Sequence, residues 1–182
     1  PWETVFGYIW DPIFCKDGLH VAVSVQQDMA YAMVLDGASW EQTFSAMTAT
    51  VLSPDGRHTA AAVQVADFGE ADIETFQKGC FTAAVDGSRW DPSFVNVWNL
   101  AFSADGSKLA AEVRLNLYEY TIVVDGVPWG NTYNCVWEPM FHPAGGVMAP
   151  VRAGGKWRLY QDDNPLWDRP FVQLWHPVVS PD

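Results

Sequence analysis

Basic residues, cysteine and long apolar stretches are all scarce in this sequence. Lys and Arg number 10 against 22 Asp and Glu, which gives a net charge of −12. A surface that binds nucleic acid or an anionic membrane needs a field of Lys and Arg, so neither partner is expected. No apolar stretch approaches the ~18 residues of a membrane-spanning helix, and no signal peptide is visible. Direct membrane insertion is therefore not expected.

Only three cysteines are present, Cys15, Cys80 and Cys135, and they lie far apart. The absence of Cys-x-x-Cys and Cys-x-x-Cys-His argues against a zinc ribbon, a covalently attached haem and a cysteine-rich iron–sulfur site. Free thiols fit a reducing compartment better than a disulfide scaffold. The four histidines lack metal-ligand spacing, and neither a nucleophile elbow nor a glycine-rich phosphate loop occurs. We therefore expect no metal, no cofactor and no catalytic residues, so the chain is not expected to be an enzyme.

Tryptophan, in contrast, is abundant, with ten in 182 residues. Five of these tryptophans open copies of a repeat, at steps of 38, 50, 39 and 38 residues: Trp2, Trp40, Trp90, Trp129 and Trp167. The longest step is the same repeat with an insertion. This period is close to the ~40 residues of a four-stranded propeller blade.

Within each repeat, runs rich in Val, Ile, Thr and Tyr are separated by Asp-Gly pairs, which favour type I′ hairpin turns because Asp and Gly tolerate positive φ. The turns before the repeat-opening tryptophans are Asp36-Gly37, Asp86-Gly87, Asp125-Gly126 and the near-equivalent Asp163-Asn164. The pattern predicts strands throughout and no convincing helix. Pro12, Pro139 and Pro177 fall inside the first strand of their repeats, which fits an inner edge strand because proline cannot donate to a central ladder.

The predicted fold is an all-β propeller built from four-stranded antiparallel blades of about 38 residues each. The predicted divisions of this single domain are 1–7 (outer strand of a preceding blade), 8–45 (a blade), 46–95 (a blade with an inserted loop at 66–80), 96–134 (a blade), 135–172 (a blade) and 173–182 (inner strand of a following blade). Propellers usually close a ring, and open sheet edges invite aggregation. We therefore expect this sequence to be an excerpt of a ring of six to eight blades.

Four further tryptophans fall eight residues after a repeat-opening one: Trp10, Trp98, Trp137 and Trp175. Because both sets recur in register, we expect them to fill the wedges between neighbouring blades, and not to form a ligand platform or a path for electrons. Trp157 alone lies outside this scheme. Alanines on the predicted second strands, such as Ala60 and Ala110, fit a close approach of neighbouring blades.

The insertion after Val65 is a candidate partner-binding loop. It replaces a tight hairpin with a long acidic loop that carries Phe68, Ile73 and Phe76. Inserted loops on a rigid repeat scaffold tend to hold partner contacts. A tolerated surface insertion is the alternative.

A second candidate is a ring of polar residues on the first strands. Nine residues after a repeat-opening tryptophan come Asp11, Asn99, Glu138 and His176. If these strands line a central channel, alternate side chains point into it, and this ring could bind a cation or a polar ligand. The alternative is that polar residues merely wet a solvent-filled channel.

The segments Ser53-Pro-Asp-Gly56-Arg-His-Thr-Ala-Ala-Ala62 and Phe102-Ser-Ala-Asp-Gly106-Ser-Lys-Leu-Ala-Ala111 resemble the Phe-Ser-Pro-Asp-Gly-Lys-x-Leu-Ala repeat of bacterial WD40-like propellers of the TolB type. More narrowly, Val-Val-Asp-Gly-x-x-Trp with a high tryptophan content resembles the TmcD family, the tryptophan-rich subunits of the transmembrane redox complex of sulfate-reducing bacteria. This narrower resemblance implies a cytoplasmic scaffold, held at the inner membrane by cytochrome and iron–sulfur subunits.

Three hypotheses about function remain open at this point. The first is a non-catalytic protein-interaction subunit of a membrane-associated electron-transfer complex on the cytoplasmic side. The second is a periplasmic, TolB-like interaction propeller. The third is a ligand-binding or hydrolytic propeller that acts through the ring of polar residues in the channel.

Overall fold

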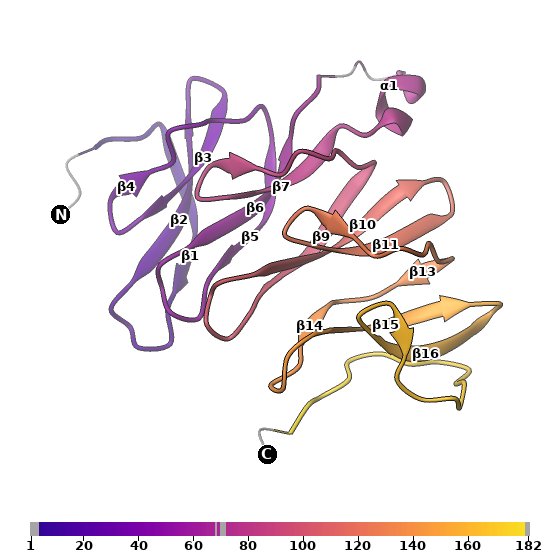
Figure 1. Ribbon diagram of the computed structural model, residues 1–182. Coiled ribbons are helices and arrows are strands. Elements are labelled where there is room, and N and C mark those ends of the chain that lie inside the picture. The colour runs from indigo at the N-terminus through magenta and orange to yellow at the C-terminus, as the bar shows by residue number, and fades with distance from the viewer. Residues whose placement is uncertain (1–3, 68, 70–71, 181–182) are drawn as a thin grey trace.

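The computed structural model describes residues 4–67, 69 and 72–180. Four antiparallel sheets follow one another along the chain, and we call them blades 1 to 4 (Figure 1). Blade 1 contains β1 (Tyr8–Phe14), β2 (Val21–Gln27), β3 (Ala30–Leu35) and β4 (Ala38–Ser39). Blade 2 contains β5 (Met47–Leu52), β6 (Thr59–Gln64), β7 (Phe81–Val85) and β8 (Ser88–Arg89). Blade 3 contains β9 (Asn96–Phe102), β10 (Leu109–Asn116), β11 (Glu119–Val124) and β12 (Val127–Pro128).

Blade 4 contains β13 (Cys135–Val136), β14 (Met140–Phe141), β15 (Val147–Ala153), β16 (Lys156–Gln161) and β17 (Asn164–Pro165). Both β13 and β14 pair with β15, so they are two parts of one broken first strand. In each blade the strands pair in chain order. The predicted all-β fold of four-stranded antiparallel propeller blades is thus confirmed.

The prediction that the chain has no helix is wrong at one place. The helix α1 (Ile73–Lys78) lies in the insertion between β6 and β7. Asp72 begins it, because its side chain accepts a hydrogen bond from the backbone N–H of Thr75 at 2.9 Å. Glu74 and Lys78, one helical turn apart, form an exposed ion pair. Local capping and charge pairing of this kind support a short helix that buries no side chain.

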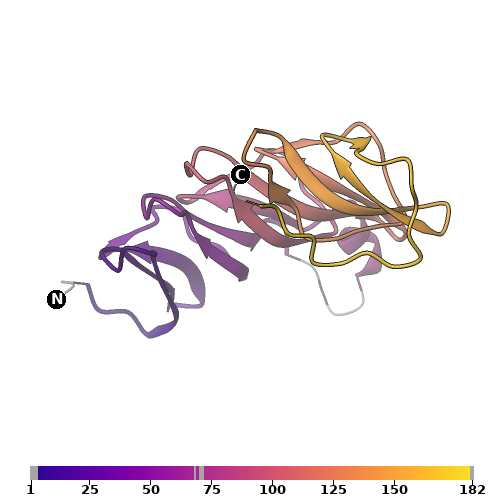
Figure 2. The ribbon, with the colours of Figure 1, turned by 90° about the horizontal axis from the view of Figure 1, so that it is seen from below.

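The connections of the blades form two edges of the molecule. The turns from first to second strand and from third to fourth strand lie along one edge, which we call the turn edge. The turns from second to third strand, including α1, lie along the opposite edge, which we call the hairpin edge (Figure 1). The blades stand side by side, with blade 1 and blade 4 at opposite ends of the row (Figure 2).

The Asp-Gly turns have the positive φ angles that their sequence predicts. Asp36 has a φ of 50° and Gly37 a φ of 94°. The Asp36 carboxylate also accepts a hydrogen bond at 2.9 Å from the backbone N–H of Val21, which opens the second strand. In blade 4 the equivalent turn is Asp162–Asp163, with φ of 46° and 68°, and not the predicted Asp163-Asn164.

The hydrophobic core lies between successive blades. One cluster joins blades 1 and 2, a second joins blades 2 and 3, and a third joins blades 3 and 4. Alanines of the second strands are almost fully buried in these clusters: Ala22, Ala60, Ala61, Ala62, Ala110, Ala111 and Ala149. Their small side chains let adjacent sheets pack closely, as the sequence pattern predicts.

The repeat-opening tryptophans Trp40 and Trp90 pack between blades, as expected. The indole Nε1 of Trp40, at the end of blade 1, donates a hydrogen bond of 2.8 Å to Oγ1 of Thr59 in blade 2. A methyl group added at Gly87 in blade 2 would lie 3.2 Å from Trp40, and one at Gly126 in blade 3 would lie 3.3 Å from Trp90. The turn glycine therefore leaves room for the indole of the preceding blade. Trp2 lies outside the described residues.

The second set of tryptophans makes ring contacts that the sequence did not predict. In three of the four, the ring contacts an aromatic residue of its own blade, two strands away. The pairs are Trp10 with Tyr31 (5.9 Å between ring centres), Trp98 with Tyr120 (6.5 Å) and Trp137 with Trp157 (5.7 Å).

Trp157, which lay outside the tryptophan pattern in the sequence, occupies a position that holds an aromatic residue in every blade. It occupies the position of Tyr31, Phe81 and Tyr120 on the third strand, where each forms a bridge to an aromatic residue that follows the fourth strand. The sequence analysis missed this position because four different aromatic pairings occur there. In blade 2 the first-strand tryptophan is replaced by Thr48.

Candidate functional site

The predicted ring residues Asp11 and Asn99 lie at a bulge in the first strand of their blades. Asp11, Asn99 and His176 have φ angles of 50°, 48° and 46°, and the same is true of Ala49 in blade 2, with 52°. The strand register shifts at this point in blades 1, 2 and 3. Asp and Asn tolerate this left-handed conformation better than other residues with a side chain. Backbone geometry thus accounts for the polar residues Asp11 and Asn99 without a ligand.

One carboxylate beside this bulge was missed from the sequence. Glu112, on β10 of blade 3, is 6% exposed. Its Oε2 accepts a hydrogen bond of 2.8 Å from the Nδ2 of Asn99. Burial is the main cause that raises the pKa of Glu112 to about 7, against the opposing effect of the Asn99 hydrogen bond and with a smaller contribution from the nearby Glu138 carboxylate. Glu112 can therefore bind or release a proton near neutral pH.

A comparison of the repeats could have revealed Glu112. On the second strands, Glu112 pairs with Trp98 as Ser24 pairs with Trp10 and Ala62 with Thr48. The segment Leu-Ala-Ala-Glu thus places an acid where the preceding blade has a third alanine. An ionisable residue in a position otherwise held by small side chains indicates a specific role or a local cost in stability.

The structure brings some of the ring residues together and leaves one apart. Glu138 lies in the break between β13 and β14, and its Oε2 is 3.7 Å from Nδ1 of His176. Glu138 is also close enough to Glu112 to affect its ionisation. Asp11 lies on β1, at the far end of the row of blades. The cluster that the structure supports is therefore Asn99, Glu112, Glu138 and His176.

This cluster offers polar contacts but limited metal chemistry. Among residues 4–67, 69 and 72–180, no three His, Cys, Asp or Glu side chains are arranged to hold a metal ion. Cys135 lies beside the cluster, and burial, followed by the Glu112 charge, raises the pKa of its thiol. A thiol with a raised pKa is a poor nucleophile. The cluster can accept a cationic or hydrogen-bonding group.

The inserted loop lies on the hairpin edge. Of its three predicted contact residues, Ile73 is 66% exposed, and Phe76 is partly buried. Phe68 lies outside the described residues. The sulfhydryl of Cys80 donates to the carbonyl of Thr75 at 3.3 Å, which ties the end of the loop to β7.

Apolar side chains are also exposed at the neighbouring turns of the hairpin edge. Met29, at the β2–β3 turn, is 78% exposed, and Tyr118, at the β10–β11 turn, is 73% exposed. Leu117 lies beside Tyr118 and is also exposed. Together with Ile73, these residues place apolar groups on the turns of three successive blades, and we call Met29, Ile73, Leu117 and Tyr118 the apolar hairpin edge.

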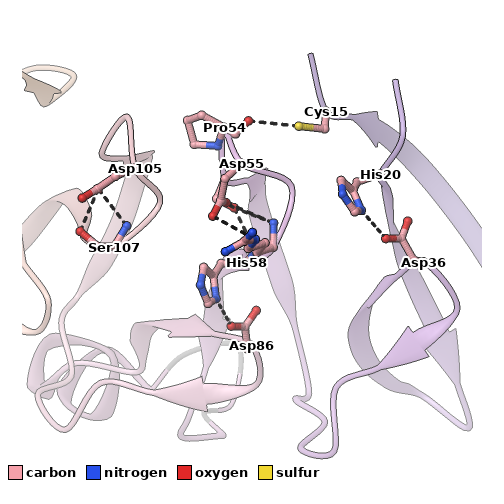
Figure 3. Close-up of polar contacts among 11 residues, drawn as sticks. Cys15, His20, Asp36, Pro54, Asp55, His58, Asp86, Asp105 and Ser107 are labelled. Atoms are coloured by element: carbon pink, nitrogen blue, oxygen red, sulfur yellow. Dashed lines mark hydrogen bonds and ion pairs between the residues drawn. The ribbon is translucent and has the colours of Figure 1, made fainter. Parts of the chain in front are cut away.

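The turn edge is polar where blades 1 and 2 meet (Figure 3). His20 donates a hydrogen bond of 2.7 Å from Nδ1 to Asp36, and His58 donates one of 2.6 Å to Asp86. The hydrogen bond to Asp36 raises the pKa of His20, and the same contact lowers the pKa of Asp36. The sulfhydryl of Cys15 donates to the carbonyl of Pro54 at 3.1 Å, which links the two blades.

Comparison with known proteins supports the fold. No family model and no curated protein matches the chain. A crystal structure of the eukaryotic initiation factor is similar to the chain, with a TM-score of 0.53 and 16% identity, over 93% of this chain and 46% of that one. TolB from Acinetobacter baumannii has a TM-score of 0.46 and 16% identity, over 84% of this chain and 40% of TolB.

These likenesses are informative about architecture alone. The chain has an all-β fold of propeller blades and spans less than half the length of either similar structure. The narrower resemblance to the TmcD family gains no support from them. In the described part of the chain, no helix has the length and apolar character that crossing a membrane requires.

Proposed function

We propose that the protein is a non-catalytic interaction propeller that binds a partner protein through the apolar hairpin edge. The observation that carries this proposal is the exposure of Met29, Ile73 and Tyr118 on the turns of three successive blades. The turns that carry Met29 and Tyr118 join paired strands, and Ile73 lies on α1, in the insertion between β6 and β7. Exposed apolar side chains that follow one edge of a domain favour an interaction surface along that edge.

The negative charge of the chain favours a basic partner surface over an acidic one at this edge. The chain carries a net charge of −12, and Asp28, Asp72 and Glu119 lie beside the apolar side chains. A partner surface with apolar residues surrounded by Lys and Arg would complement this edge. Complementary charge of this kind increases the association rate and excludes acidic partners.

A finer version of the proposal makes the protein a subunit of a membrane-associated electron-transfer complex. The tryptophan-rich repeat supports it through the resemblance to the TmcD family. In that case cytochrome and iron–sulfur subunits would carry the electrons, and this chain would hold them from the cytoplasmic side. A TolB-like periplasmic interaction propeller is the alternative, and it uses the same edge.

The proposal is tested by replacing the apolar hairpin edge without altering the blades. The variant Met29→Ser/Ile73→Ser/Tyr118→Ser removes three exposed apolar groups. The matched control is Leu19→Ser/Val127→Ser, because these side chains are 78% and 69% exposed on the turn edge. Tagged forms of both variants and the parent would be purified from native membranes and soluble extract, and the co-purifying proteins quantified.

The two versions of the proposal give different results in this experiment. A partner that is lost from the hairpin-edge variant and retained by the control supports the interaction role. Haem absorbance and iron in that partner fraction support the electron-transfer version, whereas envelope proteins without either support the TolB-like version. Retention of every partner by the hairpin-edge variant would refute the interaction role of this edge.

A further inference from the structure

An open groove lies between blades 3 and 4 on the turn edge, opposite to the apolar hairpin edge. Its volume is about 1050 Å³, and its walls include Phe102, Lys108, Trp129, Met140, Phe141 and His142. A volume of this size and an aromatic lining are typical of a site for a small molecule. At the corresponding places between blades 1 and 2 and between blades 2 and 3, side chains of one blade pack against turns of the next.

The first of these contacts joins the turns between first and second strands. A methyl group at Gly56 of blade 2 would lie 2.5 Å from the His20 ring of blade 1. One at Gly106 of blade 3 would lie 2.7 Å from the carboxylate of Asp55 in blade 2. At Gly145, the equivalent glycine of blade 4, a methyl group would meet nothing within 4 Å. The turn of blade 4 therefore stands away from blade 3.

The second contact involves the repeat-opening tryptophans. Trp40 packs on Gly87 of the next blade, and Trp90 packs on Gly126. For Trp129 the equivalent turn position is held by Asp163. The carboxylate of Asp163 accepts hydrogen bonds from the hydroxyl of Tyr133 and, at 2.8 Å, from the Nδ2 of Asn131. Asp163 thus ties the two blades together beside Trp129, and no turn glycine covers the indole as in the other blades.

The carboxylates of the groove are already engaged within the protein. Asp105 accepts from the hydroxyls of Ser103 and Ser107, which holds its pKa at about 2. Asp162 accepts from the backbone N–H of Val147 at 2.8 Å, and Asp163 has the partners given above. These hydrogen bonds fix the positions of the three carboxylates, which keep their negative charge, and Lys108 is the lysine among the lining residues.

Two donors, in contrast, remain available. The Nδ1 of His142 accepts a hydrogen bond of 3.0 Å from the backbone N–H of Ala144. In the neutral imidazole this leaves the proton on Nε2, which is then a donor. Lys108 is exposed and forms no ion pair with any residue in the described ranges. In blades 1 and 2 the equivalent residues are His20 and His58, which are both bonded to a turn aspartate.

We propose that this groove binds a small aromatic molecule that bears a carboxylate. The aromatic ring lies against Trp129 and the phenyl rings of Phe102 and Phe141. The carboxylate accepts hydrogen bonds from the ammonium of Lys108 and from Nε2 of His142. Aromatic stacking supplies affinity, and the charge-assisted hydrogen bonds select an anion over a cation.

The test uses probes of one shape and opposite charge. Binding of 1-naphthoate and of 1-naphthylmethylamine to the full chain would be measured by isothermal titration calorimetry. The groove should bind naphthoate at one site and the amine at least tenfold more weakly. Lys108→Gln should weaken naphthoate binding about tenfold, which is the loss expected for one charge-assisted hydrogen bond. Lys156→Gln, on the hairpin edge, should leave it unchanged.

A second variant tests whether the ligand binds in the groove, without changing a charged residue. Ala104 lines the groove at an exposed turn, so Ala104→Trp should block the groove and abolish naphthoate binding without disturbing a buried position. Circular dichroism would confirm that each variant is folded. The proposal is overturned if naphthoate does not bind, if the amine binds equally well, or if neither Lys108→Gln nor Ala104→Trp weakens binding.

Discussion

The buried carboxylate of Glu112 accepts a hydrogen bond of 2.8 Å from the side-chain amide of Asn99. Asn99 stands at the bulge of β9, where its φ is 48°, and Glu112 stands on the adjacent strand β10. A left-handed bulge in the first strand therefore directs an amide toward an acid of the second strand. The backbone conformation at Asn99 thus places a hydrogen-bond donor beside a carboxyl group whose pKa is about 7.

The Glu112 carboxyl makes the stability of the protein depend on pH. Because burial raises its pKa from 4.5 to about 7, the folded protein holds a proton that the unfolded chain releases between these values. The favourable contribution is complete below pH 4.5 and is lost as the pH rises to 7. The loss is about 3 kcal/mol, since one pKa unit corresponds to about 1.4 kcal/mol.

Glu112→Gln should remove this dependence. Urea unfolding at several pH values should show the variant to be more stable than the parent at pH 8, by an amount that shrinks toward pH 4.5. Glu119→Gln, at an exposed position of β11, is the control and should follow the parent. An equal pH dependence in Glu112→Gln and the parent would show that Glu112 is not the responsible group.

The hydrogen bond between Trp40 and Thr59 should stabilise the contact of blades 1 and 2. Trp40 is 8% exposed and Thr59 is 1% exposed, so Thr59→Val leaves the indole N–H buried without its acceptor. Such a loss costs about 1–3 kcal/mol. The free energy of unfolding from urea titration should fall by this amount, whereas Thr48→Val, at an exposed position, should change it little. Equal effects of both substitutions would contradict the role assigned to the bond.

The pair His20–Asp36 should be visible in a proton titration. The hydrogen bond to Asp36 raises the pKa of His20, so any stability from the pair is complete below pH 6.5 and is lost as the pH rises through the folded pKa. Asp36→Asn keeps an oxygen for the Val21 N–H but removes the charge. In nuclear magnetic resonance titration, the His20 pKa should decrease toward 6.5 in Asp36→Asn. A pKa that does not move would show that the pair is not formed in solution.

Ala49 occupies the strained bulge position of blade 2, with a φ of 52°. A residue of this kind in the left-handed region costs roughly 1–2 kcal/mol, which Asn reduces. Ala49→Asn should therefore raise the free energy of unfolding by about 0.5–1 kcal/mol. The mirror substitution Asp11→Ala, at a φ of 50°, should lower it by a similar amount. A lower free energy of unfolding in Ala49→Asn, or a higher one in Asp11→Ala, would mean that packing, and not backbone conformation, determines which residue is preferred at these positions.

The features that recur from blade to blade could be predicted from the sequence, because the residues responsible for them recur in each repeat. The Asp36-Gly37 type of turn, the alanines of the second strands and the inter-blade role of Trp40 all follow from residues that recur in register. Glu112 and Asp163 follow from the sequence only in part, because a comparison of the repeats reveals their positions but not their contacts. Each is a departure from the repeat at a single blade, and its meaning depends on neighbours that only the folded structure provides.

The internal contacts of the second tryptophan set were also beyond the sequence. Trp98 and Trp137 recur as regularly as Trp40, and recurrence alone does not say which neighbour a ring contacts. Asn99, directly after Trp98, has a positive φ, and the register of β9 shifts there. Recurrence predicts a structural role for these residues, and the structure adds the rings that they contact, Tyr120 for Trp98 and Trp157 for Trp137.

The most direct test of the proposed role is the affinity of the apolar hairpin edge for its partner. The partner recovered with the parent chain would be purified and titrated against the parent, Met29→Ser/Ile73→Ser/Tyr118→Ser, and the control Leu19→Ser/Val127→Ser by biolayer interferometry. Loss of exposed contact side chains predicts an increase in Kd of at least tenfold for the hairpin-edge variant, or about 1.4 kcal/mol, with the control unchanged. An unchanged Kd for the hairpin-edge variant would contradict the account.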